Sequence, residues 1–512
     1  MMRSLWKLLS AFVVTATVAS CGGKDNPDPV PTPEAPTAVT LSSSSAHVAQ
    51  PGEEITLDIT SPSRPAVTGE TDWATAKLGI FNTQTFKMTG VKITVSANPT
   101  YEPRTATLTF KAGSASATFT ITQAGKEVVK DPELPDNDAV ARARELGLGW
   151  NMGNQLDAIN NGVSNETCWG NPEATQATFD GVKAAGFTSV RIPVTWEGHI
   201  GAAPDYQIDD AWMNRVYEVV GYARNAGLNV ILNTHHDEDH GEGHWQNLKG
   251  AVDNAATNKQ VKEEIAAVWS QIAEKFKEEG DYLMLESFNE LIYGKDAWDI
   301  GSNAQKKADV INEWNQVFVD AVRATGGNNA TRWLGVPGYA ANPRYLQYFK
   351  LPDDSARKTM VAYHCYDPYD YTIGDKQLPN WGHTGTSYPK GEEEIKELFN
   401  SLYTKYIANN IPIYMGEFGC SFRSQSDAKA WAYFNYYLEY VVKAAKTFGI
   451  PAFLWDNGGS DGAGKEKHHY INHGTGQYYS TSKEPVQAMV KAWTSTDPTY
   501  TLQAVYDSAP EF

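Results

Sequence analysis

Eight short runs of apolar residues, separated by longer segments, follow one another from about residue 138 to the end of the chain. Runs of this length, bounded by Gly, Asn or Pro, are typical of buried strands. We predict them at 148–154, 189–193, 229–235, 282–289, 332–336, 360–364, 413–417 and 452–455. The longer helical patterns between them lie at 257–279, 303–325, 391–409 and 425–447. Eight strands with interposed helices predict an α/β fold that closes into a parallel (β/α)8 TIM barrel over residues 138–512.

The segment between the second and third predicted strands shows the helical pattern clearly. Val216, Val219 and Val220 recur at the spacing of one helix face. Asp209 stands where a side chain can cap the first turn, and Gly227 stands where a helix commonly ends. These signals predict a helix that packs its apolar face on the barrel.

Polar residues stand at the ends of the predicted strands. The carboxyl ends of the strands form the face of a TIM barrel that carries catalysis. A barrel that served stability alone would not need two Glu, two His and one Arg on a single face. These residues are Asn151, Asn154, Arg191, His235, Asn289, Glu290, His364, Tyr366, Glu417 and Trp455.

Two of these residues are carboxylates on strands that we expect to face each other. Glu290 follows the fourth predicted strand and Glu417 ends the seventh. Glycosidases use such a pair, separated by about 5–5.5 Å in retaining enzymes and about 6.5–9.5 Å in inverting ones. Glu286 also lies in the fourth strand, and we expect it deeper in the barrel, paired with a basic group.

The first 37 residues predict export and anchoring rather than folded structure. Arg3 and Lys7 precede a short apolar run at 8–18, which is typical of a signal peptide over residues 1–20. The segment Val18-Ala-Ser-Cys21 resembles a bacterial lipobox, which implies that Cys21 is lipidated. The following Gly-Gly-Lys-Asp loosely resembles the export signal of Bacteroidetes surface lipoproteins. We therefore expect a lipid anchor in the outer membrane, exposed at the cell surface, with the Pro-rich segment 21–37 as a spacer.

Residues 38–125 have a different pattern, in which small and apolar residues alternate with polar ones. Alternation at 55–59, 91–95, 106–110 and 117–121 predicts half-buried strands in a small all-β, immunoglobulin-like sandwich. Trp73, the segment 98–108 and the segment 121–125 resemble a BACON domain, a module of gut-bacterial carbohydrate enzymes. The resemblance implies glycan binding or spacing, and we favour spacing because no cluster of exposed aromatics is evident. Residues 126–137 are charged and contain Pro, which predicts a linker.

The barrel segment resembles glycoside hydrolase family 5 over roughly residues 138–500. The motifs that carry the resemblance are 149–154 (GWNMGN), 190–193 (VRIP), 232–236 (LNTHH), 287–290 (SFNE), 364–366 (HCY), 414–419 (YMGEFG) and 453–457 (FLWDN). The segment 166–171 (ETCWGN) further resembles subfamily 4, which contains endo-glucanases that act on xyloglucan, mixed-linkage β-glucan and soluble cellulose derivatives.

The resemblance implies a retaining mechanism. Glu290 protonates the leaving oxygen and later activates water, while Glu417 attacks the anomeric carbon and forms a glycosyl-enzyme. Arg191 is expected to hold Glu417 ionised, because a nearby cation lowers a carboxyl pKa. Tyr366 is expected to donate a hydrogen bond to Glu417.

The resemblance also implies residues that bind or orient the sugar. His364 and Asn289 are expected to orient Glu290 and the sugar 2-hydroxyl, and Trp455 to form the floor under the sugar at the cleavage point. The remaining expected contacts and possible further aromatic subsites are His235, His236, Asn154, Trp169, Trp196 and Trp245.

Charge and histidine spacing limit the other possibilities. The net charge of −18 argues against a nucleic-acid partner and favours a neutral polymer as substrate. The run from His235 to His240, with His244, contains metal-ligand residue types, but its spacing fits no zinc site, so we expect no metal and no cofactor.

We therefore predict a retaining endo-β-1,4-glucanase, most active on xyloglucan, that works as a monomer on a plant β-glucan. The enzyme alternatives are a mixed-linkage β-glucanase or a carboxymethylcellulose-active cellulase, with mannanase and xylanase less favoured. A non-catalytic glycan-binding protein should have lost one of the two carboxylates. A structural surface protein is disfavoured by the convergent polar strand ends.

Overall fold

The computed structural model describes residues 33–239, 243–460 and 462–512. The chain divides between Glu127 and Val128 into two compact units, each of which is described by itself. Cys21 and most of the segment 21–37 lie outside the described residues. Within the described part, no helix has both the length and the apolar character that a bilayer crossing requires.

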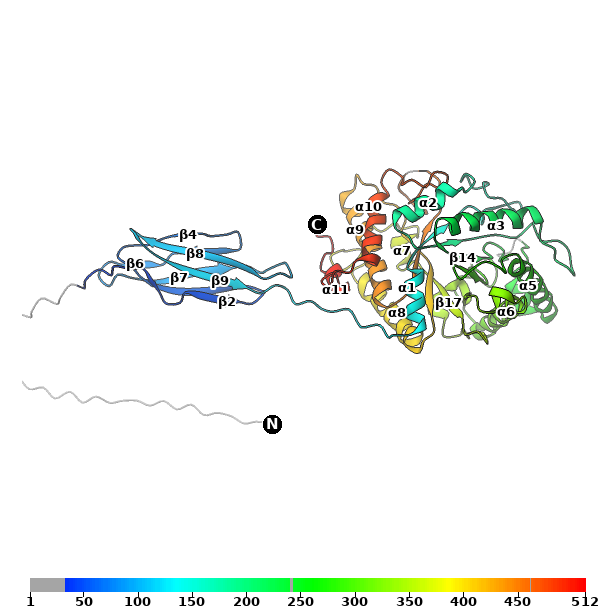
Figure 1. Ribbon diagram of the computed structural model, residues 1–512, viewed down its shortest axis with the longest axis horizontal. Helices are drawn as coiled ribbons and strands as arrows, with labels where there is room; N and C mark the ends of the chain where they lie inside the picture. Colours follow the sequence, from blue (N-terminus) through cyan, green and yellow to red (C-terminus); the bar gives the residue numbers. More distant parts are fainter. Residues whose placement is uncertain (1–32, 240–242, 461) are drawn as a thin grey trace, which may run out of the picture. The chain divides into compact units, whose positions relative to one another are not determined.

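The N-terminal unit is a β-sandwich of two sheets (Figure 1), as predicted. One sheet contains β1 (Thr40–Leu41), β3 (Glu53–Thr60), β7 (Lys87–Val95), β5 (Ala74–Lys77) and β6 (Ile80–Asn82). The other contains β2 (Ser45–Val48), β9 (Ala115–Gln123), β8 (Arg104–Ala112) and β4 (Ala66–Thr68). The inward residues of their alternating strands, including Leu57, Ile93, Leu108 and Phe119, form one apolar core.

The described surface of the sandwich has few exposed aromatic or large apolar side chains. Trp73 is half-buried, and the Arg104 guanidinium lies 4.2 Å above its ring. Among the described residues of this unit, Ile80 is the one large apolar side chain that is strongly exposed. No strongly exposed aromatic ring is found among the described residues of this unit.

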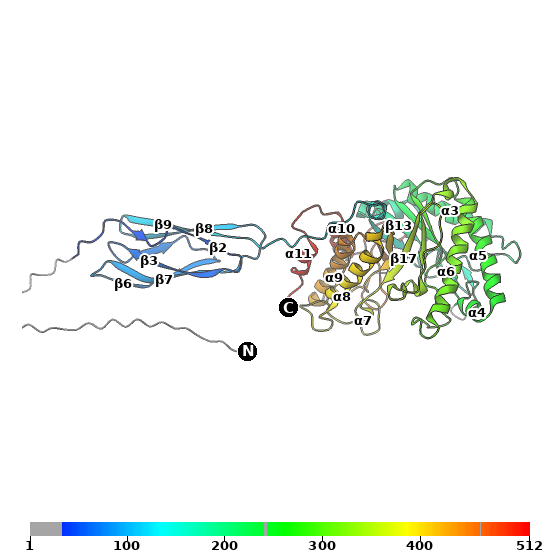
Figure 2. The same cartoon turned by 90° about the horizontal axis from the view of Figure 1, so that it is seen from below.

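The C-terminal unit contains a closed parallel barrel, which confirms the predicted fold class (Figure 2). Its strands, in order around the barrel, are β10 (Leu148–Met152), β13 (Ser189–Ile192), β14 (Asn229–Asn233), β15 (Leu283–Glu286), β16 (Leu334–Pro337), β17 (Thr359–Cys365), β18 (Ile413–Phe418) and β19 (Ala452–Asp456). The fourth strand ends at Glu286, three residues earlier than predicted, so that Glu290 lies in the loop that follows it.

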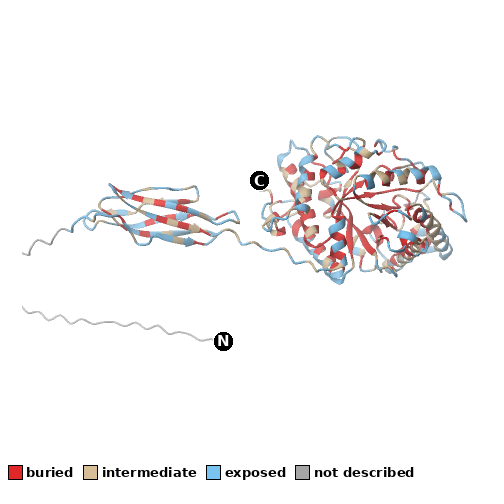
Figure 3. Cartoon of the chain, in the orientation of Figure 1, coloured by how far each residue is buried: buried red, intermediate tan, exposed pale blue. Residues whose placement is uncertain are grey.

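Helices surround the barrel. They are α1 (Asp138–Leu146), α2 (Gln176–Ala185), α3 (Asp210–Asn225), α4 (Leu248–Asp253), α5 (Ala255–Lys275), α6 (Ala304–Ala324), α7 (Tyr369–Thr372), α8 (Gly391–Lys405), α9 (Ala428–Thr447), α10 (Lys483–Thr494) and α11 (Leu502–Tyr506). In α3 the Asp209 side chain accepts a hydrogen bond from the Ala211 N–H, and Gly227 has a positive φ just after the helix, as expected. The buried faces of the helices meet the outward faces of the strands (Figure 3).

A second, smaller apolar cluster fills the inside of the barrel. It contains Met284, Met360, Tyr414 and Phe453, from strands around the ring. Small residues make room for the large rings: a Cβ at Gly335 would lie 2.1 Å from the Tyr414 hydroxyl. The barrel is therefore a packed core below its open end, not a pore.

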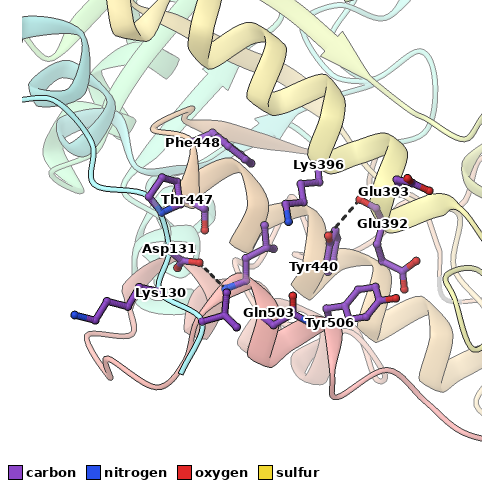
Figure 4. Close-up of a pocket in the computed structure, with 13 residues that line it drawn as sticks. Lys130, Asp131, Glu392, Glu393, Lys396, Tyr440, Thr447, Phe448, Gln503 and Tyr506 are labelled. Carbon is purple, nitrogen blue, oxygen red and sulfur yellow. Dashed lines mark hydrogen bonds between the residues drawn. The ribbon is translucent and has the colours of Figure 1, made fainter. Parts of the chain in front are cut away.

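Part of the predicted linker 126–137 packs on the barrel unit. The Leu502 N–H donates to an Asp131 carboxylate oxygen at 2.8 Å, and Lys443 pairs with the other oxygen at 2.7 Å. Residues 129–132 also line a cavity of about 490 Å³ beside α8, α9 and α11 (Figure 4). The segment after Glu127 is therefore fastened to the outer helices before α1 begins.

Candidate active site

Strand alternation directs the polar side chains into the barrel mouth. On β17, Met360 and Ala362 belong to the interior cluster, whereas Val361 and Tyr363 face the helices. His364 is the next inward residue, at the carboxyl end of the strand. The same alternation of side chains directs Arg191 of β13 inward, since its neighbours Val190 and Ile192 face the helices. Because side chains alternate with a period of two, each strand delivers one residue to the mouth.

Glu417 reaches the interior through an irregularity in β18. Tyr414 faces inward, so simple alternation would turn Glu417 toward the helices. Tyr363 pairs with Met415 but His364 pairs with Glu417, so Gly416 is an extra residue in the ladder. Such a bulge re-aims the side chains that follow it. Phe418 accordingly packs in the helix-facing cluster, and Glu417 joins the inward set.

Glu417 is buried and held by two donors. The Arg191 Nη1 lies 2.8 Å from its Oε1, and the Tyr366 hydroxyl donates to its Oε2 at 2.9 Å. Burial raises the pKa of Glu417 above its ordinary value, while His364, Arg191 and Tyr366 act in the opposite direction. The expected effect of Arg191 is therefore present, but the effect of burial is larger than that of the cation.

Glu290 is more exposed and is held by one neighbour. The His364 Nδ1 lies 2.7 Å from its Oε1 and 3.7 Å from the Glu417 Oε2. Burial acts to lower the pKa of His364, but Glu417 and Glu290 beside the ring outweigh it and raise that pKa. His364 thus stands between the two carboxylates and favours its protonated form.

The two carboxylates face the same space. One oxygen of Glu290, one oxygen of Glu417 and one ring nitrogen of His364 all lie within 4.8 Å of one another. This separation is close to the carboxyl spacing of about 5–5.5 Å in retaining glycosidases and shorter than that of inverting ones.

Arg191 pairs mainly with Glu286, which lies deeper in the barrel than Glu290. Its Nη2 lies 2.7 Å from Glu286 Oε1, which confirms the expected basic partner. Tyr414 and Asn233 also donate to this carboxylate, at 2.6 and 2.9 Å. Burial alone would raise the pKa of Glu286, but Arg191 and these donors lower it below the ordinary value. Tyr414 and Asn233 were not among the predicted site residues; their place at inward strand positions is the signal that could have found them.

Asn289 is fixed at both ends of its amide. Its Oδ1 accepts from Arg191 Nη2 at 3.0 Å, and its Nδ2 donates to Glu238 Oε1 at 3.3 Å. Burial raises the pKa of Glu238 well above its ordinary value, with further contributions from Asp237 and Glu290. Sequence reasoning treated Glu238 only as part of a histidine-rich run, because its contact with Asn289 joins two separate loops.

Aromatic rings gather on the side of the mouth formed by β10, β14 and β19. The ring of His235 stacks parallel to Trp455, with centroids 5.8 Å apart, and His236 lies against His235 and against the exposed Trp169. Burial, His236, Arg191 and His364 all lower the pKa of His235, so this imidazole is neutral. The structure therefore brings the four predicted sugar-binding rings together.

Three other predicted contacts have different surroundings. Trp196, a candidate further subsite, is fully buried and donates to the Asn233 carbonyl, so it packs inside the barrel unit and cannot stack on a sugar. Trp245 is half-buried and donates to Asp237 at 2.9 Å. Asn154 adopts a left-handed turn conformation, and its N–H donates to Asp157, which places it in the loop framework after β10.

Two groups of described residues have the ligand types and spacing that could hold a metal ion: Asp157, His235 and His236, and the pair Glu290 and Glu417 with His364, with one ligand atom from each member within 4.8 Å of the others. Asp157 accepts backbone N–H bonds from Asn154 and Gln155, and His235 contacts the Asn233 amide at 3.2 Å. These partners give the group a structural role in shaping the loop. His240 of the same run lies outside the described residues.

Known proteins share both units of the chain. The model of the family described as cellulase (glycosyl hydrolase family 5) matches residues 154–461, and the BACON model matches residues 67–124. Endoglucanase A of Paenibacillus barcinonensis is 38% identical over an alignment of 333 residues that covers 61% of this chain and 81% of that protein. The xyloglucan-specific endo-beta-1,4-glucanase of Bacteroides ovatus is 34% identical over an alignment of 433 residues that covers 80% of this chain and 83% of that protein. The solved structure of a GH5-4 broad specificity endoglucanase from Bacteroides salanitronis is 46% identical with a TM-score of 0.67, and covers 72% of this chain and 99% of that one.

Proposed function

Because the chain belongs to glycosyl hydrolase family 5 and carries a BACON domain, we propose that this glycoside hydrolase is a retaining endo-β-1,4-glucanase with xyloglucan as its favoured substrate. Glu417 is the nucleophile and Glu290 the acid/base. The observation that carries the proposal is the approach of their carboxylate oxygens to within 4.8 Å around His364. Inverting enzymes separate the two carboxyl groups by about 6.5–9.5 Å to admit a water, which is farther than this approach.

The contacts of each carboxylate support the division of roles. Glu417 is bound by a guanidinium and a phenol, and both groups favour its ionised form, as a nucleophile requires. Glu290 is the more exposed of the pair and lines an open cavity of about 680 Å³, where a leaving group and later a water have access. Bonding to the shared His364 sets its orientation.

The reaction proceeds in two displacements. Glu417 attacks the anomeric carbon, the bond to the glycosidic oxygen breaks, and Glu290 gives its proton to that oxygen. Glu290 then accepts a proton from water as the water attacks the same carbon and releases Glu417. The Trp455 ring, which stacks on the buried His235, offers an apolar face to the sugar, and Asn289, fixed between Arg191 and Glu238, offers an amide to its hydroxyls.

A fluorinated sugar tests the two carboxylate roles directly. A 2-deoxy-2-fluoro β-cellobioside with a good leaving group should inactivate the enzyme by accumulating the covalent intermediate. Mass spectrometry of the digested protein should then find the added sugar on Glu417. Modification of any other residue, or release of inverted sugar by NMR of fresh product, would refute the proposed mechanism.

Xyloglucan is favoured because the alignment with the xyloglucan-specific relative covers 80% of this chain, which is more than the barrel alone. The second candidate is a broader β-glucanase, favoured by the higher identity to the GH5-4 broad specificity endoglucanase. Initial rates on tamarind xyloglucan, barley β-glucan and carboxymethylcellulose separate the two. A rate on barley β-glucan equal to or above that on xyloglucan would select the second candidate.

We further propose that Cys21 is lipidated and anchors a monomer at the outer membrane, on the cell surface. The support is the signal-like segment before Cys21 and the Pro-rich segment after it. Cys21→Ser should release the enzyme from the membrane fraction and remove the incorporation of labelled fatty acid. Retention of both in the variant would refute the anchor.

A further inference from the structure

Glu238 carries a buried carboxyl group that the two-carboxylate mechanism does not use. It stands in the loop after β14, and only 4% of the residue is exposed. Its Oε1 accepts a hydrogen bond from the Asn289 Nδ2 at 3.3 Å, while its Oε2 has no hydrogen-bond partner among the described residues. A carboxyl group in such a place costs folding free energy, because water no longer solvates it. Groups of this kind beside a catalytic pair commonly serve the reaction.

The loop around Glu238 is held by contacts that do not involve its side chain. The Gln246 N–H donates to the Asp237 carbonyl at 3.0 Å, and the Asp239 N–H donates to the Gln246 carbonyl at 3.2 Å. The Gln246 side chain also donates to the Thr234 hydroxyl at 2.7 Å. The carboxyl group of Glu238 is therefore presented from a fixed backbone and is not needed to close the loop.

Asn289 connects Glu238 to the nucleophile. The Arg191 Nη2 donates to the Asn289 Oδ1 at 3.0 Å, and its Nη1 donates to the Glu417 Oε1 at 2.8 Å. A guanidinium group can only donate hydrogen bonds, so the amide oxygen of Asn289 must face Arg191. Its NH2 group consequently faces Glu238, which accepts the bond.

The NH2 group of Asn289 has one hydrogen more than the protein uses. Nδ2 carries two hydrogens, and within the part of the chain that the structure describes Glu238 Oε1 is their one acceptor. An amide is planar, so contacts at Oδ1 and at one hydrogen also fix the direction of the other hydrogen. Hydrogen bonds weaken steeply when the angle is poor, so this direction decides how well a sugar hydroxyl can be bound.

The surroundings of Glu238 favour its uncharged form. Burial raises its pKa well above the ordinary value, and Asp237 and Glu290 raise it further, while the bond from Asn289 acts in the opposite direction. His236 also faces the carboxyl group, with its Nδ1 3.9 Å from Oε1. A protonated Glu238 still offers a carbonyl oxygen to Asn289, and it adds no negative charge next to Glu290.

We propose that Glu238 is a positioning residue, whose Oε1 fixes the plane of the Asn289 amide so that the free amide hydrogen meets the 2-hydroxyl of the sugar at the cleaved bond. This inference rests on the proposed function, because it concerns the sugar that Glu417 attacks. Hydrogen bonds to the 2-hydroxyl strengthen in the transition state of glycoside hydrolysis. Loss of the positioning contact should therefore lower kcat more than it changes KM.

A pair of variants of similar size tests the contact. Glu238→Met removes the acceptor, whereas Glu238→Gln keeps an acceptor oxygen and is uncharged like the protonated acid. With 4-nitrophenyl β-cellobioside, Glu238→Met should lower kcat/KM about tenfold, mainly through kcat, the fold-change for one lost hydrogen bond. Glu238→Gln should stay within about threefold of the wild type. An equal loss in both variants would overturn the inference.

Glu264→Gln is the matched control for removing a carboxyl group. Glu264 lies on the outer helix α5, and burial raises its pKa to about 7. The control should leave kcat and KM unchanged. Glu238→Leu removes the same acceptor as Glu238→Met and should give the same loss, so the test does not depend on the folding of one variant.

Removal of the 2-hydroxyl from the substrate gives a readout that a merely structural role would not move. The second substrate is 4-nitrophenyl β-cellobioside without the 2-hydroxyl on the ring that bears the aryl group. The ratio of kcat/KM with and without this hydroxyl should fall about tenfold in Glu238→Met and stay unchanged in Glu238→Gln. An unchanged ratio in Glu238→Met would overturn the inference and leave the proposed function in place. A wild-type enzyme that hydrolyses neither the aryl cellobioside nor a soluble β-glucan would refute the proposed function and the inference with it.

A double variant tests whether Glu238 acts through Asn289. Groups that act through one contact have losses that do not multiply. Asn289→Ala combined with Glu238→Met should therefore lower kcat/KM no further than Asn289→Ala alone. A further tenfold loss in the double variant would show that Glu238 acts by another route and would contradict the positioning role.

Discussion

The surroundings of Glu417 and Glu290 differ, although both carboxylates approach His364. Glu417 lies inside the barrel on an irregular strand, with Arg191 and Tyr366 on its oxygens. Glu290 lies in a loop, with His364 on one oxygen and an open cavity in front. The barrel mouth therefore has two sides. On the fixed side, around Glu417, a negative charge is held in place. On the accessible side, around Glu290, a proton is transferred and the leaving group departs.

Removal of the carboxylate on the fixed side should have the largest effect. Glu417→Ala should lower kcat on glucan by roughly 10⁵- to 10⁶-fold, because no covalent intermediate can form. Binding of a cello-oligosaccharide, measured by calorimetry, should persist. Turnover within about tenfold of the wild type would place the nucleophile elsewhere and remove the basis of the comparison.

Removal of the carboxylate on the accessible side should depend on the leaving group. Glu290→Ala should lower kcat on glucan by about 10²- to 10⁴-fold, the usual contribution of a general acid. An aryl glycoside with an acidic phenol needs no proton, so the burst of phenol in the first turnover should stay fast while later turnovers are slow. Loss of that burst would show that Glu290 serves the same step as Glu417.

The fixed side should also carry more of the folding stability. Arg191→Met leaves Glu286 and Glu417 buried without their cation, which should lower the free energy of unfolding by about 3–5 kcal/mol. Arg344→Met breaks an exposed ion pair in the accessible cavity and should cost about 1 kcal/mol or less. Urea unfolding of both variants measures the contrast, and equal losses would contradict it.

The smallest expected effect is on the pH profile. The Tyr366 hydroxyl bonds the ionised form of Glu417 and so lowers its pKa. Tyr366→Phe should therefore raise that pKa, shift the acidic limb of kcat/KM to higher pH, and reduce the maximum about 10- to 100-fold.

Tyr363→Phe is the matched control, because this buried hydroxyl on β17, three residues before Tyr366, makes no hydrogen bond with the described residues. It should leave the profile in place. A shift of the acidic limb to lower pH in Tyr366→Phe would contradict the assigned role.

The fold and the composition of the site were largely predictable from local pattern. Short apolar runs identified all eight barrel strands, and helical spacing together with Asp209 identified α3 and its cap. The strand ends then supplied Arg191, His364 and Glu417. Trp298 and Tyr369, which line the cavity beside Glu290, could not be found in this way, because they follow the strands in loops without a periodic pattern.

Local sequence therefore determined which residues stand at the mouth: apolar spacing sets each strand, and the strand end fixes the residue that emerges from it. Tertiary structure alone decided how those residues act. The bulge at Gly416 arises from pairing between β17 and β18, and it turns Glu417 inward. Burial raises the pKa of Glu417, and Arg191 pairs mainly with Glu286. Both effects depend on strands that are far apart in the chain. Electrostatic interactions and desolvation depend on how close groups lie in space, and closure of the barrel brings these groups together.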